Sequence, residues 1–174
     1  IAKALAVYSG FTEGLQLFSS FIILLNFPRF GKMKGMGQII TYSIRDESLH
    51  VEAMTKLFRE FIQENINLWT DDFKKEIYQA CRDMVDLEDR FVDLVFEVGE
   101  IEGLPKEEMQ QYIRYIADRR LLQIGLKPNY DVHDNPLTWR DDVLGLEHQN
   151  FFEGRSTSYM KAGLRGDLEK VNFV

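Results

Sequence analysis

Glu47 and His50 are residues whose types and spacing could do chemistry. On an α-helix, side chains three residues apart leave from the same face, so a carboxylate and an imidazole would point to one place. Together they suit iron, manganese or zinc. Ile44 and Leu49 flank the pair and favour burial, where an ionised carboxylate needs a metal ion or a hydrogen bond. The same spacing also occurs on ordinary helix surfaces.

Glu13, a second candidate ligand, lies in an apolar run between Phe11 and Leu15. Helix bundles that hold two metal ions take one Glu from each of two helices and a Glu-x-x-His pair from each of two others. This chain supplies one of each, which is half of such a ligand set. The alternative for Glu13 is a buried carboxylate that pairs with an arginine or a histidine.

Helices must position these residues, and the apolar periodicity of the sequence predicts four of them. Thr70 is a good N-cap for the third helix, and Asp71 and Asp72 add the negative charge that suits a helix N-terminus. Gly125 and Pro128 end the fourth. No alternation of apolar and polar residues predicts a strand, so the expected fold class is all-α. The predicted helices are 3–27, 33–65, 71–98 and 105–124.

The second and third predicted helices carry apolar residues at helical spacing, which we expect to face inward. On the helix 33–65 these residues are Ile39, Ile40, Ile44, Met54, Leu57, Phe58 and Phe61. On the helix 71–98 they are Ile77, Met84, Leu87, Phe91, Leu94, Val95 and Val98.

The composition, 45% apolar and 28% charged residues, indicates a globular chain. A net charge of −7 disfavours nucleic acid and anionic membranes as partners. The apolar run 21–25 is too short to span a bilayer. The single cysteine, Cys81, fits a reducing cytosol rather than a disulfide framework. We therefore expect a cytoplasmic protein in which Cys81 is a buried helix residue.

The helical pattern weakens after residue 130, and the chain is predicted to have three parts. Residues 1–130 would form a helical half-bundle that carries half of a di-metal site. Residues 131–153 would form an irregular segment packed over it, with Pro136, Trp139 and the pair Phe151 and Phe152 as anchors. Residues 154–174 are rich in Ser, Gly and charged residues and cannot build a core, so we expect a flexible tail.

Several motifs, in the same order along nearly the whole chain, resemble the small, radical-generating subunit of class I ribonucleotide reductase. They are TEGL (12–15) continuing to Phe21, IRDESLH (44–50), YIADRRL (115–121), IGLKP (124–128), NPLTW (135–139), NFFE (150–153) and SY (158–159). The resemblance implies a ferritin-like di-metal helical bundle, of which this chain would be the second half. The implied metal ligands are Glu13, Glu47 and His50, completed by three from the other half. The implied cofactor is Fe/Fe, with Mn/Fe or Mn/Mn as alternatives.

The resemblance also implies roles around the ligands. Asp46 would accept hydrogen bonds from a histidine ligand of the other half and from an aromatic residue that passes the radical outward. The alternative is an exposed Asp46 that pairs with Arg45. Leu17, Phe21 and Ser43 would line a dry pocket around the radical or the metal ions. Leu17 replaces the usual Phe, and Ser43 stands where an apolar residue is frequent, so a tyrosyl radical and a high-valent Mn/Fe oxidant both remain open.

The family's helix is often distorted around the ligand that Glu13 resembles, so we expect a π-bulge there. Gly10 and Gly14 would leave room for a carboxylate that changes its binding mode.

The resemblance also implies that Tyr159, in the tail, relays the radical across the interface with the large subunit, and that Glu153, just before the tail, assists the movement of its proton. The alternative is an incidental exposed tyrosine. The last residues, with Phe173 as the apolar anchor, would dock into a groove of the large subunit.

Nothing in this sequence corresponds to the family's earlier helical half, and the chain begins at Ile1, without Met, where the resemblance implies the interior of a long helix. We therefore interpret the chain as the C-terminal half of the small subunit of ribonucleoside-diphosphate reductase, an oxidoreductase of deoxyribonucleotide synthesis. It would act only with the N-terminal half and the large subunit, and whole small subunits would form homodimers. A split-gene product, a proteolytic piece and an incomplete chain all fit. Two other functions stay open: a ferritin-like di-metal oxidase that serves no reductase, and a non-catalytic half-bundle.

Overall fold

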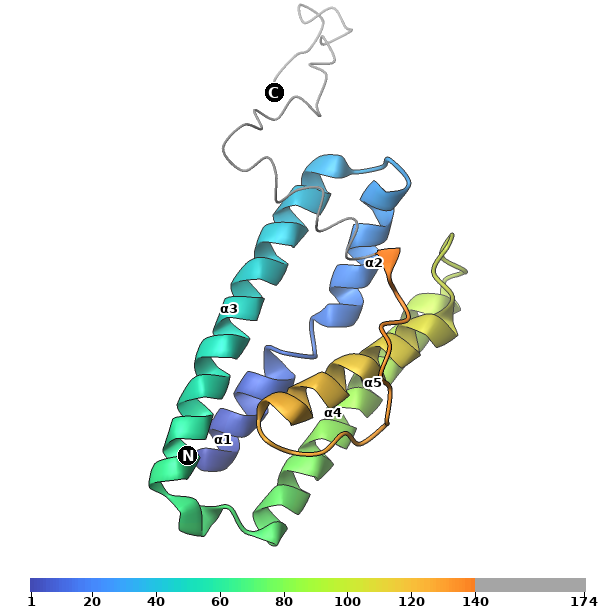
Figure 1. The fold of residues 1–174 in the computed structure, drawn as a ribbon. Helices are drawn as coiled ribbons and strands as arrows, with labels where there is room; N and C mark the ends of the chain where they lie inside the picture. Colours follow the sequence, from blue (N-terminus) through green and yellow to red (C-terminus); the bar gives the residue numbers. More distant parts are fainter. Residues whose placement is uncertain (140–174) are drawn as a thin grey trace, which may run out of the picture.

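The computed structural model describes residues 1–139, and this part of the chain is mostly helical (Figure 1). Within these residues no strand occurs, and one isolated bridge pairs Ile101 with Leu104. The all-α fold class is therefore confirmed. In chain order the elements are α1 (Ala2–Val7), the π-helical segment η1 (Tyr8–Thr12), α2 (Phe18–Arg29), α3 (Lys34–Glu64), the 3-10 turn η2 (Ile66–Leu68), α4 (Asp71–Glu97) and α5 (Lys106–Gln123).

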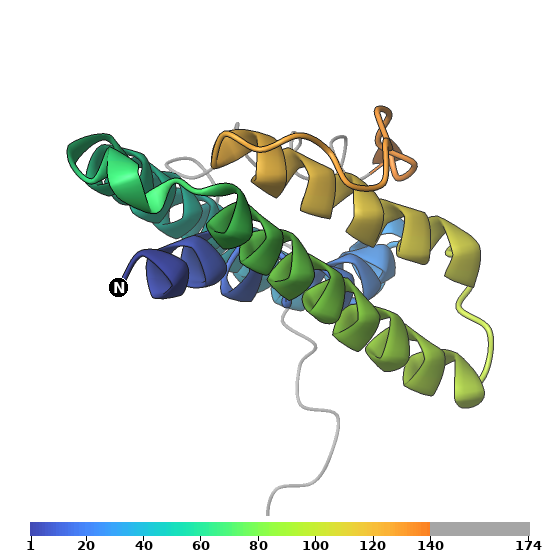
Figure 2. The ribbon, with the colours of Figure 1, turned by 90° about the horizontal axis from the view of Figure 1, so that it is seen from below.

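The long helix α3 packs along α1, η1 and α2, and α4 packs against α5 and α1 (Figure 1). Seen from below, α4 runs between α5 on one side and α1 on the other (Figure 2). A single apolar core lies between these elements, and its burial drives their association. Its largest fully buried side chains include Phe11, Leu15, Ile22, Leu25, Phe58, Ile77, Tyr112, Ile113 and Leu121.

Local signals in the sequence fix several helix ends. The hydroxyl of Thr70 accepts a hydrogen bond from the Phe73 N–H (3.2 Å), so the predicted N-cap of α4 is confirmed. The helix α5 ends as predicted, because Gly125 adopts a φ of 86° directly after Ile124.

The predicted continuous helix over 3–27 is wrong, whereas the π-bulge predicted within it is confirmed. The Glu13 N–H donates to the Tyr8 carbonyl (3.1 Å), and the Gln16 N–H donates to the Phe11 carbonyl (3.1 Å), so both bonds span five residues. Residues 13–17 then form a turn, and α2 begins at Phe18. Apolar spacing cannot reveal this break because it carries no information about the hydrogen-bond register.

The inward faces are only partly as predicted. On α4 the buried residues are Ile77, Cys81, Val85, Glu88 and Val92. Four residues predicted to be inward are exposed instead: Leu87, Phe91, Leu94 and Val98. The prediction is wrong there because α4 carries two apolar stripes, and α5 and α1 cover only one of them. On α3, Ile39 and Leu57 are likewise exposed. The burial predicted for Cys81 is confirmed, and it raises the pKa of the thiol to about 12.

A buried carboxylate holds the chain that follows α5. Asp118 is 2% exposed and accepts hydrogen bonds from the backbone N–H groups of Asn129, Tyr130 and Val132, at 2.7, 2.9 and 2.9 Å. Three N–H donors compensate the cost of burying this charge. Asp118 therefore ties an irregular segment to the bundle.

The same segment continues along the bundle as far as Trp139. Leu137 is fully buried, and the Arg29 guanidinium lies 4.7 Å from the centre of the Trp139 ring. The remainder of the segment predicted at 131–153, and the whole tail predicted at 154–174, lie outside the described residues.

A second buried carboxylate joins α4 to α2. Ser19 on α2 donates a hydrogen bond to Glu88, which is 6% exposed. Burial raises the pKa of Glu88 to about 7; the Ser19 hydrogen bonds oppose this rise, and the neighbouring charge of Asp89 adds to it. Near neutral pH the core therefore contains a carboxyl group that is partly protonated.

This carboxyl should make stability depend on pH. The folded protein keeps a proton that the unfolded chain loses above its ordinary pKa of 4.5, so the free energy of unfolding falls from about pH 4.5 and levels off above about pH 7. The Glu88→Gln side chain cannot ionise. The free energy of unfolding of this variant should therefore exceed that of the wild type by on the order of 2–3 kcal/mol at pH 8, but by much less at pH 5. Denaturant titrations at both pH values measure this difference. If the difference in free energy of unfolding between the variant and the wild type were the same at pH 5 and pH 8, the predicted effect of Glu88 ionisation would be wrong.

Candidate metal centre

Three side chains from two segments meet beside α3. Glu13 directly follows the π-helical segment, and Glu47 and His50 lie one turn apart on α3. One ligand atom of each lies within 4.8 Å of the other two. The Nδ1 atom of His50 is 3.7 Å from Glu13 Oε2 and 3.5 Å from Glu47 Oε2. Ligands that are each about 2.1 Å from one ion stand ~3–4 Å apart, so these separations suit a shared ion.

The chemistry of this cluster fits a divalent cation. Two carboxylates and one imidazole form the mixed oxygen and nitrogen set that iron and manganese accept, and a cation would offset the repulsion between the two negative charges. The side chains of Glu13, Glu47 and His50 are 36%, 22% and 59% exposed, so the cluster is open on one side. Among residues 1–139 no other His, Cys, Asp or Glu belongs to it. Their role as metal ligands stays a prediction.

Asp46 precedes Glu47 on α3, but its side chain is 59% exposed. Its carboxylate lies 3.7 Å from Arg45 Nε, which is the pairing that the sequence left as the alternative. An exposed ion pair of this kind contributes little stability. The role of Asp46 as a hydrogen-bond acceptor for a histidine of another half stays a prediction.

The three residues predicted to line a dry pocket differ in their surroundings. Phe21 is buried, with its ring edge-on to Phe18 at 5.8 Å between centroids. Leu17 is 41% exposed. Ser43 is partly buried, and its hydroxyl donates to the Ile39 carbonyl (3.2 Å). Their function as a pocket lining stays a prediction, and Glu153, Tyr159 and Phe173 lie outside the described residues.

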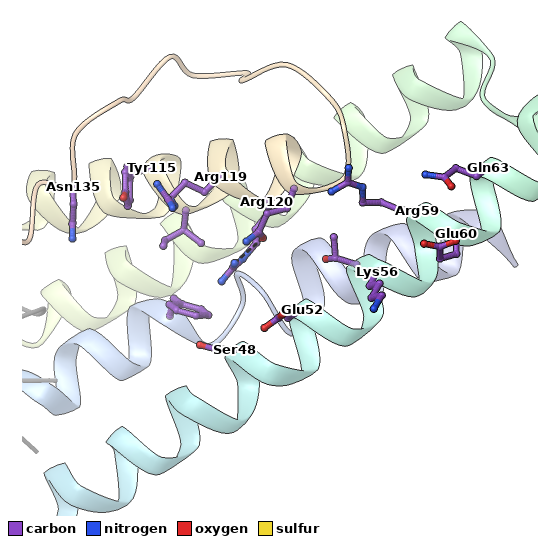
Figure 3. A pocket seen from close by; sticks show the side chains of 14 residues that line it. Ser48, Glu52, Lys56, Arg59, Glu60, Gln63, Tyr115, Arg119, Arg120 and Asn135 are labelled. Carbon is purple, nitrogen blue, oxygen red and sulfur yellow. Dashed lines mark hydrogen bonds between the residues drawn. The ribbon is translucent and has the colours of Figure 1, made fainter. Parts of the chain in front are cut away.

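A polar pocket of about 850 Å³ lies between α3 and α5 (Figure 3). Lys56 and Arg59 on α3, together with Arg119 and Arg120 on α5, give it a basic character that Glu52 and Glu60 partly offset. The pocket also reaches Phe18, at the start of α2.

Sequence reasoning missed two contacts that join elements of the bundle. Glu88 occupies a position in line with Cys81 and Val85 on the buried face of α4, and this periodicity could have indicated its burial. Arg120 donates a hydrogen bond from Nε to the carbonyl of Gly14, 106 residues away. No local pattern signals the second contact.

The comparisons with known proteins point to one family. Residues 1–136 match the family model described as "Ribonucleotide reductase, small chain". The chain is 47% identical over 169 residues to a protein of Invertebrate iridescent virus 3 named "Probable ribonucleoside-diphosphate reductase small subunit"; the match covers 96% of this chain and 45% of that protein. It is 37% identical to the ribonucleoside-diphosphate reductase subunit beta of Chlamydia pneumoniae, over 92% of this chain and 46% of the relative.

A solved structure, the ribonucleotide reductase R2 subunit from Clostridium botulinum, matches with a TM-score of 0.73 and 30% identity. The match covers 82% of this chain and 44% of that one. The chain therefore spans about half the length of the relatives that it matches. No helix in residues 1–139 combines the length and apolar character that crossing a membrane requires.

Proposed function

Because this chain belongs to the small-chain family of ribonucleotide reductase, we propose that it is the C-terminal half of the radical-generating small subunit of a ribonucleoside-diphosphate reductase. We use the term assembled small subunit for this half together with the N-terminal half that completes the metal site. The observation that carries the proposal is the convergence of Glu13, Glu47 and His50 in a chain of this family.

The three residues would supply half of the ligands for two metal ions, and the N-terminal half would supply the other three. Fe/Fe is the proposed pair, with Mn/Fe and Mn/Mn as alternatives, because these ligands suit all of them. When bound, the pair would supply the one-electron oxidation, driven by O2, that ribonucleotide reduction needs. Glu13 is 36% exposed at the end of a distorted helix, and this position would let its carboxylate shift as the centre reacts.

Other residues of this chain would protect the oxidising equivalent and guide it. Phe21, with Leu17 and Ser43, would exclude water and reductants once the N-terminal half covers them. Asp46 would orient a histidine ligand of that half by accepting its N–H. Tyr159, in the tail, would carry the oxidising equivalent toward the large subunit, and Glu153, just before the tail, would accept or return the phenolic proton.

The proposed partners follow from the same assignment. The tail 154–174 would bind the large subunit, with Phe173 as its apolar anchor. The N-terminal half would cover exposed apolar residues of α3 such as Ile39 and Leu57. The assembled small subunit would form a homodimer in the cytoplasm and would bind neither nucleic acid nor membrane.

Native mass spectrometry of the purified protein, followed by denaturation of the same sample, tests this function. We expect two metal ions for each pair of N-terminal and C-terminal halves, whether or not the halves are one polypeptide. The metal-loaded protein should reduce ribonucleoside diphosphates only when the large subunit is added. After removal of residues 160–174 it should be inactive even in the presence of the large subunit. An assembly that oxidises substrates without a large subunit, and ignores this deletion, would instead be a di-metal oxidase.

A further inference from the structure

The turn after Glu13 takes the helical partner away from the Gly14 carbonyl. In a regular α-helix the Gly14 carbonyl would accept from the Phe18 N–H, but that N–H donates to Leu15 instead (3.0 Å). Gly14 is buried, and a buried carbonyl needs a donor. Arg120 provides one: its Nε lies 2.9 Å from the Gly14 oxygen.

The structure around Arg120 holds its guanidinium in place. The group lies 5.4 Å from the centre of the Phe18 ring, and its Nη1 donates to the Gln123 side chain (2.9 Å). In Figure 3, Arg120 extends from α5 into the pocket, toward the segment that joins η1 to α2. A Cβ at position 14 would lie 2.7 Å from Arg120 Nε and would collide with the Gly10 carbonyl. Glycine is therefore required for this close approach.

We propose that Arg120 is a positioning residue for the metal ligand Glu13. It satisfies the carbonyl of the next residue along the chain, and so it fixes the turn from which the Glu13 carboxylate extends. The proposal rests on the proposed function only in taking Glu13 as a ligand. Partners that orient a ligand typically change metal affinity by about 10–100-fold when they are removed.

Arg120→Met tests the proposal, because methionine keeps much of the aliphatic stem over Phe18 but cannot donate to Gly14. Arg119→Met is the matched control. Arg119 is the neighbouring arginine and lines the same pocket, and its guanidinium lies over Tyr115, at 5.5 Å from the ring centre. Both variants are made in the assembled small subunit. Metal affinity is measured with Fe²⁺ and Mn²⁺ by competition with a chelator, and hydrogen–deuterium exchange is followed over residues 8–18 without metal.

We expect Arg120→Met to bind metal about 10–100-fold more weakly than the wild type and to exchange its backbone amide hydrogens faster over residues 8–18. Arg119→Met should match the wild type in metal affinity and in exchange rate. Wild-type metal affinity in both variants would overturn the proposal, even if Arg120→Met were less stable. An equal loss of metal affinity in both variants would also overturn it, because it would indicate a charge effect of the pocket. If Arg120→Met fails to fold, Gly14→Ala displaces Arg120 from the other side, and unchanged metal affinity in that variant overturns the proposal.

Failure of the proposed function has a different signature. A wild-type protein that binds no metal would refute the metal centre itself. The exchange measurement on the metal-free protein would still decide whether Arg120 holds the turn.

Discussion

Glu47→Gln should lower the metal affinity of the assembled small subunit by at least the ~100-fold that loss of a partner that only orients a ligand can cost, because Glu47 would bind the ion directly. Glu47 is the least exposed member of the cluster, with its Oε2 atom 3.5 Å from His50 Nδ1. The substitution keeps the shape of the side chain but replaces an anionic ligand by a neutral amide. Metal content after dialysis against a chelator, measured by elemental mass spectrometry, checks the prediction. Ribonucleotide reduction should be lost together with the metal.

Two controls separate loss of a ligand from loss of the fold. Glu52→Gln changes an exposed carboxylate on the same helix, outside the cluster, and should keep both metal ions. Without metal, Glu47→Gln should unfold at the same or a higher temperature than the wild type, because it removes one of two negative charges whose oxygens lie within 4.8 Å. If Glu47→Gln retained both ions at wild-type affinity, Glu47 would not be a ligand.

Tyr159→Phe should leave the metal centre intact but slow ribonucleotide reduction by on the order of 1,000-fold, which corresponds to about 4 kcal/mol in the barrier. A phenol can give up an electron together with its proton, whereas a phenylalanine ring has no proton to release and is much harder to oxidise. The change removes a single oxygen atom, so binding to the large subunit should persist. The measurements are metal content, affinity for the large subunit and steady-state turnover.

The matched control is Tyr115→Phe, which removes a phenol oxygen from a partly buried residue of α5. This variant should keep wild-type turnover, because Tyr115 is not on the proposed route. If the turnover rate of Tyr159→Phe stays within a few-fold of that of Tyr115→Phe, Tyr159 does not relay the oxidising equivalent.

Local sequence signals predicted much of the fold. Caps and breakers act over three or four residues, so the start of α4 at Thr70 and the end of α5 before Gly125 could be read directly from the sequence. The spacing of Glu47 and His50 likewise placed both on one helix face, because helical geometry repeats within a single turn.

Where a feature depended on partners distant in the sequence, local patterns failed. Both apolar stripes of α4 have helical spacing, and only the positions of α5 and α1 decide that Cys81 and Val85 are buried while Leu87 and Leu94 are exposed. The π-bulge was predicted from a family resemblance, since the spacing of apolar residues does not encode hydrogen-bond register.

The candidate site shows the same division. The sequence by itself determined which side chains could bind a metal ion and that two of them share a helix face. Only the tertiary structure brought Glu13 to within 4.8 Å of them and Arg120 to within 2.9 Å of the Gly14 carbonyl. Helix geometry is set by interactions between near neighbours in the chain, whereas these contacts exist only because core packing fixes α3 and α5 against the distorted first helix.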